Sequence, residues 1–313
     1  CRKNSNNLVR PAVGFHDHLN VQSLTPSDVI ATAYFGYSTS LMAKIAKVLC
    51  KNDDAQKYQE LFENIKAAFN EAYVADDGKI KGDTQTAYLQ ALCFDLLPKD
   101  KQRAAARHLV GRIQERNWHL STGFLGVNIL LPTLEEIGRL DIAYRLLTNE
   151  TYPSWGYLVK QGATTMWERW AGWQSSDDNS TGMGFSLNHY PFGSVGQWMF
   201  STVAGINTDG PGFKKIIIRP RPGGDLTYVK ASYRSIHGTI ATHWELTDGN
   251  LKLNVTIPAN TVATVYVPTV SADSVTESSE EANQASGVSF LRMEDNTAVY
   301  EVGSGTYSFA SRT

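Results

Sequence analysis

The hydrophobic periodicity of this chain changes once, near residue 205, and the change separates two parts of different structural class. Before it, apolar side chains recur at helical spacing between short turns, and no stretch alternates like a strand. After a turn-rich segment at 207–212, short runs alternate apolar and polar residues and end in Asp-Gly, Pro or Asn. The pattern predicts a multi-domain α and β chain, with helical hairpins over residues 1–207 and an antiparallel β-sandwich over residues 208–313.

The first part is organised as successive helical hairpins. Thr25, Pro26 and the residues that follow predict an N-cap and the first turn of a helix. The apolar stripe of this helix is expected to be core, and its members are Tyr34, Tyr37, Leu41, Ile45 and Val48. Further helices are expected near 58–69, 82–98, 99–116, 127–137, 144–147 and 196–206. Hairpins of this kind form a bundle, a solenoid or a closed α/α toroid, and the spacing does not choose among them.

The second part is expected to consist of short strands. Leu251, Leu253, Val255 and Ile257 alternate with polar residues and should form one buried face. The acidic, serine-rich segment 274–287 is expected to be a mobile loop.

Charge and cysteine content exclude several classes of function. The chain has 313 residues, with 29 Lys and Arg against 31 Asp and Glu, so neither nucleic acid nor a membrane is a predicted partner. No apolar run is long enough to span a bilayer. Cys1, Cys50 and Cys93 are too few for a disulfide framework. Cys50 and Cys93 are expected to be buried, and Cys1 is interpreted as a truncation point rather than a lipid-bearing residue. No compartment is predicted.

Candidate chemistry is concentrated between residues 162 and 190. The sequence reads Gly162-Ala-Thr-Thr-Met-Trp-Glu-Arg-Trp170, and after a polar loop Ser186-Leu-Asn-His-Tyr190. Flat apolar rings around one carboxylate suit a sugar, whose C–H faces stack on rings while its hydroxyls need a few polar partners. Glu168, placed between two tryptophans, is therefore the candidate for acid–base chemistry. The alternative is an ordinary half-buried helix carboxylate.

Four motifs in fixed order give this chain a resemblance to a known family. They are Ser121-Thr-Gly-Phe-Leu-Gly126, Tyr152-Pro-Ser-Trp-Gly-Tyr157, the Glu168 motif, and Asn188-His-Tyr-Pro-Phe-Gly-Ser-Val195. Together with the run at 211–220, they resemble the bacterial α-L-rhamnosidases, which are inverting glycoside hydrolases. The resemblance covers nearly the whole chain. It implies an α/α toroid of six helical hairpins, whose motif-bearing loops gather at one end, followed by a β-sandwich.

The resemblance also implies roles for individual residues. Glu168 matches the general base, and His189, beside Asn188, would hydrogen-bond a sugar hydroxyl. The substrate would be a terminal α-L-rhamnose of a glycoside or polysaccharide, and no cofactor is predicted. Arg169 is expected to face away and brace its loop through an ion pair. The candidates for stacking on the sugar ring are Trp155, Trp170 and Trp173.

An early segment carries one more candidate. Asp17 falls where the resembled family has a Gly-Asp-Trp loop at the rim of the pocket, but His16 and His18 stand in place of the flanking residues. Asp17 is therefore a predicted sugar contact. Two histidines and an aspartate also suggest a metal, but a usable site needs three or more converging ligands, so no metal is predicted.

The general acid of the resembled family is missing. An inverting hydrolase needs a second carboxyl about 6.5–9.5 Å from the base. The family's Arg-Asp-Glu…Gly-Trp…Gly-Asp motif does not occur in this sequence, and the helical part is about half as long as the family's toroid. The chain is therefore predicted to be the C-terminal portion of a catalytic domain, lacking its N-terminal half, and to be inactive alone.

Two other classes of function stay open. The aromatic loops could hold a sugar without cleaving it, as a carbohydrate-binding or structural module. Other α/α-toroid proteins are polysaccharide lyases or glucuronyl hydrolases, which would want basic residues near a uronate carboxylate. The loops carry few Lys or Arg, so hydrolysis of a neutral sugar is favoured.

Overall fold

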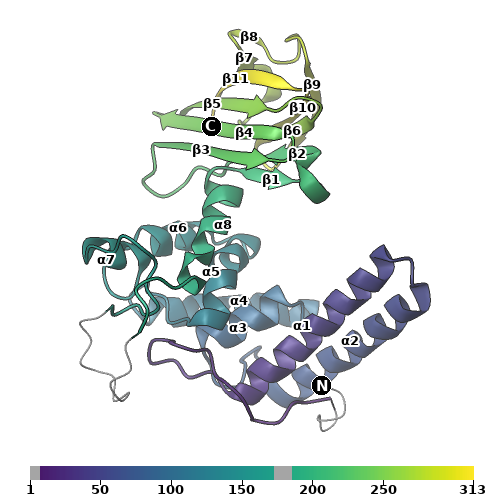
Figure 1. Ribbon diagram of the computed structural model, residues 1–313, viewed down its shortest axis with the longest axis vertical. Helices are drawn as coiled ribbons and strands as arrows, with labels where there is room; N and C mark the ends of the chain where they lie inside the picture. The colour runs from purple at the N-terminus through teal and green to yellow at the C-terminus, as the bar shows by residue number, and fades with distance from the viewer. Residues whose placement is uncertain (1–7, 173–184) are drawn as a thin grey trace. The chain divides into compact units, whose positions relative to one another are not determined.

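The chain forms two compact units, one reaching to Ser194 and the other beginning at Val195. The computed structural model describes residues 8–172 and 185–313 (Figure 1). The first unit is helical and the second is built mainly from strands, so the predicted class, helical hairpins followed by largely antiparallel sheets, is confirmed.

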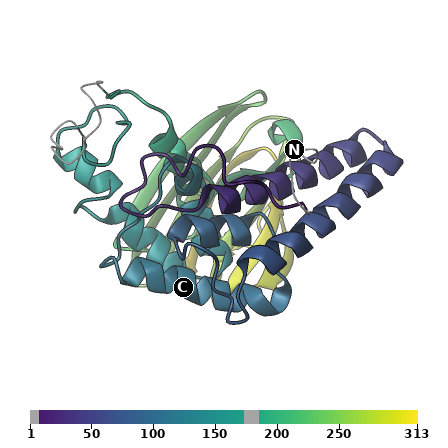
Figure 2. The same cartoon turned by 90° about the horizontal axis from the view of Figure 1, so that it is seen from below.

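The helical unit is a series of hairpins. Its helices are α1 (Ser27–Val48), α2 (Asn52–Tyr73), α3 (Gln85–Cys93), α4 (Lys99–Gln114), α5 (Phe124–Glu136), α6 (Leu140–Thr148) and the short α7 (Trp155–Lys160), followed by a 3₁₀ turn at Pro191–Ser194. Consecutive helices pack as pairs, and α1 and α2 run side by side in both views (Figures 1 and 2). In addition α3 contacts both α1 and α5, so the second hairpin links the first to the third.

The start of α1 differs from the prediction. Thr25 is not an N-cap: α1 begins at Ser27, and Pro26 before it has extended backbone. The Thr25 hydroxyl is buried and bonds to the Thr84 hydroxyl at 2.7 Å. Thr84 in turn caps α3 by accepting from the Ala87 N–H. Thr25 therefore links the start of α1 to the start of α3 and does not cap α1.

Three of the five residues in the predicted α1 core stripe are exposed. Tyr34 and Tyr37 pack on Phe94, with ring centroids 5.2 and 4.2 Å away. Leu41, Ile45 and Val48 are 37%, 51% and 82% exposed, so the prediction that they are core is wrong. Their neighbours on this half of the helix are exposed too, and we call the set of Leu41, Met42, Ile45, Val48 and Leu49 the α1 apolar face. The helical period was read correctly, but nothing among the described residues covers this face.

The cysteines are not both buried. Cys50 is exposed, because it lies in the turn between α1 and α2 with a positive φ of 55°. Its predicted burial is wrong. Cys93, at the end of α3, is partly buried, and this burial raises the pKa of its thiol. Cys1 lies outside the described residues.

The second unit opens with a short helical segment and continues as two sheets. Helix α8 (Val195–Trp198) runs into a π-helical turn at Met199–Val203. One sheet has the order β1 (Ile206–Thr208), β2 (Lys215–Ile218), β6 (Val262–Pro268), β10 (Thr297–Val302), β9 (Val288–Glu294). The other has the order β3 (Tyr228–Ser235), β4 (Gly238–Thr247), β5 (Asn250–Ile257), β11 (Gly305–Arg312), β7 (Thr276–Glu277), β8 (Glu280–Glu281). Neighbouring strands are antiparallel except β2 and β6.

The core of this unit follows the predicted alternation. The four apolar residues of β5 that were expected to share one face are all buried, at 2% exposure or less. Trp244 on β4 is fully buried, and its indole N–H donates to the Val203 carbonyl at 2.7 Å. Thr242 donates to the Ala204 carbonyl at 2.9 Å. These two hydrogen bonds satisfy the carbonyl groups at the end of the π-helical turn and hold that turn against β4.

The segment 274–287 is not a loop throughout. It contains β7 and β8, and β7 pairs with β11. Val275 and Ala282 are buried, and the Glu277 carboxylate accepts the Ser308 N–H at 3.0 Å. The loop prediction was wrong because it rested on the many exposed acidic residues of the segment. It did not take into account Val275 and Ala282, which anchor the hairpin.

Candidate functional site

The four sequence motifs converge on one aromatic cluster. The Trp170 indole N–H donates to the Thr122 carbonyl at 3.1 Å, and the Trp155 indole N–H donates to the Phe192 carbonyl at 2.9 Å. Trp170 stacks on Phe192 with centroids 3.9 Å apart and meets Trp155 edge-on at 5.3 Å. Each of these four residues comes from a different motif. Segments more than sixty residues apart in the sequence are thereby brought together.

This cluster uses the rings that were expected to stack on a sugar. Trp155 is 6% exposed and Trp170 only 2%, and both pack against protein. Neither ring has a face open to solvent in this structure. Both rings pack beneath the motif-bearing loops and support them. Trp173 lies outside the described residues.

Glu168 lies on a loop that pairs with the segment carrying His189. The Glu168 N–H donates to the Ser186 carbonyl at 3.0 Å, and the Ser186 N–H donates to Glu168 Oε2 at 2.7 Å. The His189 N–H donates to the Met166 carbonyl at 2.7 Å. Three hydrogen bonds therefore hold the carboxylate segment and the imidazole segment side by side. The carboxylate is half-buried, with one oxygen fixed by a backbone amide.

The His189 ring is held by stacking. It lies against Phe124, with centroids 5.1 Å apart and planes 27° apart, and Tyr190 lies parallel to it at 5.8 Å. Its Nδ1 is buried and has no hydrogen-bond partner among the described residues. A buried ring nitrogen without a partner costs free energy.

Two neighbours of this pair have smaller roles. Asn188 is exposed, and its backbone closes a turn with the Ser186 hydroxyl, which accepts the Asn188 N–H at 3.0 Å. The guanidinium of Arg169 lies over the Phe185 ring at 4.8 Å, in a cation–π contact, and the expected ion pair stays a prediction. Both contacts stabilise the loops on either side of residues 173–184.

Asp17 is inside the protein and not at a rim. Its side chain is fully buried, where Oδ2 accepts from the Thr86 hydroxyl at 2.5 Å and from the Gly123 N–H at 2.8 Å. Oδ1 accepts from the Leu125 N–H at 2.6 Å. Burial raises the pKa of this carboxyl, while the hydrogen bonds act to lower it. Its oxygens are already satisfied by protein, which suits a structural carboxylate better than a sugar ligand.

The segment around Asp17 does not form a metal site. His16 and His18 are both exposed, and His16 Nδ1 bonds to the Thr25 carbonyl at 2.9 Å. Within residues 8–172 and 185–313, no group of three or more potential ligands is close enough to hold a metal ion. In the same part of the chain, no helix combines the length and the apolar character needed to cross a bilayer.

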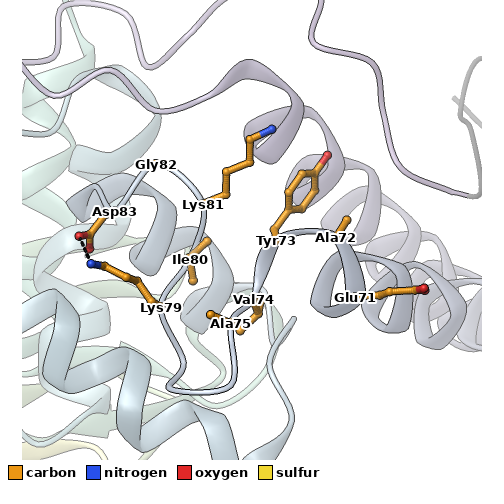
Figure 3. Close-up of a pocket in the computed structure, with 10 residues that line it drawn as sticks. All are labelled: Glu71, Ala72, Tyr73, Val74, Ala75, Lys79, Ile80, Lys81, Gly82 and Asp83. Atoms are coloured by element: carbon orange, nitrogen blue, oxygen red, sulfur yellow. Dashed lines mark ion pairs between the residues drawn. The ribbon is translucent and has the colours of Figure 1, made fainter.

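A separate cavity of about 480 Å³ lies where α2 leads into α3 (Figure 3). Its cations are already paired, Lys79 with Asp83 at 3.1 Å and Lys81 with Asp28 at 2.7 Å. None of the predicted site residues lines it. The cavity is therefore not the candidate site.

Gly123 is where the Asp17 segment and α5 meet most closely. A Cβ there would lie 2.1 Å from the His18 carbonyl oxygen and 2.7 Å from the Asn20 nitrogen. Gly123→Ala is therefore expected to lower the free energy of unfolding by about 3 kcal/mol, because backbone must move apart. Urea denaturation measures it. Gly111→Ala, in open space on α4, is the control and should be neutral or stabilising by up to about 1 kcal/mol. Equal effects of the two changes would contradict the packing described here.

Sequence reasoning missed the residues that support the site. Phe124, Phe192, Thr86 and Ser186 each touch a predicted site residue, but none was singled out as a candidate. Phe124 and Phe192 do lie inside the quoted motifs, so an apolar residue at a motif position was the available signal. Thr86 gave none, since its partner is 69 residues away.

The helical hairpins, with a carboxylate-bearing loop paired to an imidazole-bearing segment, fit a carbohydrate-active protein. Residues 2–203 match the bacterial alpha-L-rhamnosidase 6 hairpin glycosidase domain, and residues 205–282 match the bacterial alpha-L-rhamnosidase C-terminal domain. The chain therefore belongs to the bacterial α-L-rhamnosidase family.

Relatives and solved structures agree with this assignment. An alpha-L-rhamnosidase of Streptomyces avermitilis is 47% identical over 307 residues, which is 98% of this chain and 29% of the relative. One from Formosa agariphila is 37% identical over 290 residues, 92% of this chain and 31% of the relative. The structure of the Streptomyces avermitilis enzyme complexed with L-rhamnose has a TM-score of 0.91 at 46% identity, covering 99% of this chain and 29% of that one. The alpha-L-rhamnosidase from Dictyoglumus thermophilum has a TM-score of 0.87 at 30% identity, covering 100% and 35%. The chain thus spans about a third or less of the length of these relatives.

Proposed function

We propose that this chain supplies the general-base side of an α-L-rhamnosidase active site, which removes terminal α-L-rhamnose from a glycoside or polysaccharide with inversion. The observation that carries the proposal is the pairing of the Glu168 and His189 segments by three backbone-anchored hydrogen bonds. It places on adjacent loops a half-buried carboxylate and an imidazole whose Nδ1 has no hydrogen-bond partner among the described residues. The names of the relatives, and the L-rhamnose in one related structure, support the choice of sugar.

In this proposal Glu168 activates the attacking water. The Ser186 amide fixes Oε2, so the orientation of the carboxylate is set before the substrate arrives. Its other oxygen accepts a proton from water as the water attacks the anomeric carbon from the face opposite the leaving group. His189 and the Asn188 side chain hydrogen-bond sugar hydroxyls. Trp155 and Trp170 hold the loops, and stacking by Trp173 stays a prediction.

The leaving oxygen must be protonated by a second carboxyl, which we place in a part of the enzyme that precedes this chain. Asp17 is not available for that role, because three protein donors already bind its two oxygens. The α1 apolar face is where preceding hairpins of the toroid would pack. Residues 1–207 are accordingly proposed to be the C-terminal part of an α/α toroid, and residues 208–313 its sandwich domain.

The proposal predicts that the isolated chain hydrolyses an aryl α-L-rhamnoside at no more than a trace rate, because it lacks the acid. A chimera tests whether the chain becomes active once the general acid is supplied. In it, residues 8–313 replace the matching region of the Streptomyces avermitilis relative, which supplies the part of the protein that precedes this region. Release of the aryl alcohol is followed, and the chimera is expected to turn over. Robust turnover by the chain alone, or a folded chimera without turnover, would contradict the assignment.

A further inference from the structure

Asp17 is a buried carboxylate with no role in the proposed chemistry, and its contacts connect it to the His189 imidazole, which has one. We propose that Asp17 is a positioning residue, which fixes the first turn of α5 so that the ring of Phe124 sets the orientation of the His189 imidazole. The catalytic meaning of this arrangement rests on the function proposed above. The geometry has three links, and each one can be traced in the contacts.

The first link is a helix cap supplied from a distance. The residue that precedes α5 is Gly123, which has no side chain to accept the free amides of the first turn. Asp17 accepts the Gly123 and Leu125 amides with its two oxygens, from more than a hundred residues away. Since an added Cβ at Gly123 would clash with the His18 carbonyl, this cap cannot be replaced by a local one. A negative charge at a helix N-terminus is also favoured by the helix dipole.

The second link is Phe124, which lies between the two amides that Asp17 binds. The Phe124 N–H itself donates to the His18 carbonyl at 3.0 Å, so three consecutive amides are bound to the segment 17–18. Its ring is packed edge-on by His18 at 5.3 Å and by Phe192 at 5.5 Å. These contacts leave the ring face turned to His189 as its stacking surface.

The third link is the His189 ring. Catalytic and ligand-binding histidines are commonly oriented by a hydrogen bond from the second ring nitrogen to a carboxylate or carbonyl. Here the buried Nδ1 has no such partner among the described residues, so no bond from it sets the ring plane. Of the two rings that flank His189, Tyr190 is 83% exposed. Phe124, half-buried and bound through its backbone, is therefore the fixed side of the stack.

The test measures the orientation of the imidazole directly, in the full 313-residue chain. Ring protons stacked on Phe124 have displaced NMR shifts, which are recorded on protein labelled at histidine and assigned by the signal lost in His189→Gln. Phe124→Leu defines the unstacked position, and Phe124→Tyr should keep the wild-type one. Asp17→Asn leaves an amide where two backbone donors need acceptors. It is expected to move the His189 signals most of the way toward those of Phe124→Leu.

A matched variant separates positioning from general loss of stability. Glu277 in the sandwich unit is also a carboxylate that accepts a backbone amide, and Glu277→Gln should lower the unfolding midpoint without moving the His189 signals. A lowered midpoint in Asp17→Asn with unmoved His189 signals would overturn the proposal. If Asp17→Asn does not fold, the Phe124 pair decides: unmoved signals in Phe124→Leu overturn it, and moved signals that Phe124→Tyr restores support it. None of these readouts involves hydrolysis, so failure here is distinct from failure of the proposed function.

Discussion

Glu168→Gln in the active chimera is expected to lower kcat by about 100- to 10,000-fold, which is the range of rate enhancement that a positioned general base contributes. The substitution keeps the size of the side chain, and the amide oxygen can still accept the Ser186 N–H that now bonds to Oε2. What it removes is the ability to take a proton from the attacking water. The loss should therefore fall on kcat, while the dissociation constant for L-rhamnose changes little.

The matched control is Glu60→Gln, an exposed glutamate on α2 that bonds to Gln56 one turn away. It should leave turnover unchanged. Rates with an aryl α-L-rhamnoside and calorimetric titration with L-rhamnose give the two quantities. If Glu168→Gln retains turnover within about tenfold of the parent, the base is another residue. A chimera that binds L-rhamnose and never turns over would favour the carbohydrate-binding alternative.

Trp170→Ala is expected to lower the free energy of unfolding of the chain by about 4 kcal/mol, the usual cost of truncating a buried tryptophan. Trp170 is 2% exposed, stacks on Phe192 and donates to the Thr122 carbonyl, so its loss leaves a cavity where three motifs meet. Activity in the chimera should fall with it, because the Glu168 loop loses its support. Urea denaturation of the isolated chain measures the stability term.

Trp170→Phe isolates one part of this effect. A phenyl ring keeps the stack on Phe192 but removes the donor to the Thr122 carbonyl, which should cost about 1–2 kcal/mol. A sugar-stacking role makes the opposite prediction: Trp170→Ala would weaken L-rhamnose binding and leave the unfolding midpoint in place. That outcome would show that the ring turns outward in solution.

Prediction from sequence succeeded where the signal was local. The alternation in 251–257 correctly gave a buried strand face, and the helical period correctly gave the hairpins. It failed at Thr25, Ile45 and Cys50, whose environments depend on other elements. Thr25 bonds to the residue that caps α3, Ile45 is not covered by any described residue, and Cys50 lies in a turn. The segment 274–287 failed for the same reason, since its pairing with β11 has no local signature.

The candidate site shows the same division. The motif order pointed to Glu168 and His189, whose segments the structure pairs through backbone hydrogen bonds. Trp155 and Trp170 were expected to stack on the sugar ring, but both are buried in this structure and pack against protein. Asp17 was named for its place in a motif, yet its partners lie on α3 and α5.

The sequence by itself determined the family, the two-part class of the chain and the order of the four motifs, because periodicity and short motifs are properties of neighbouring residues. Only the tertiary structure decided which rings face protein, that Asp17 caps α5 from a distance, and which face of α1 is left exposed by the described residues. Burial depends on what packs against a side chain, and those partners come from segments that local sequence does not connect.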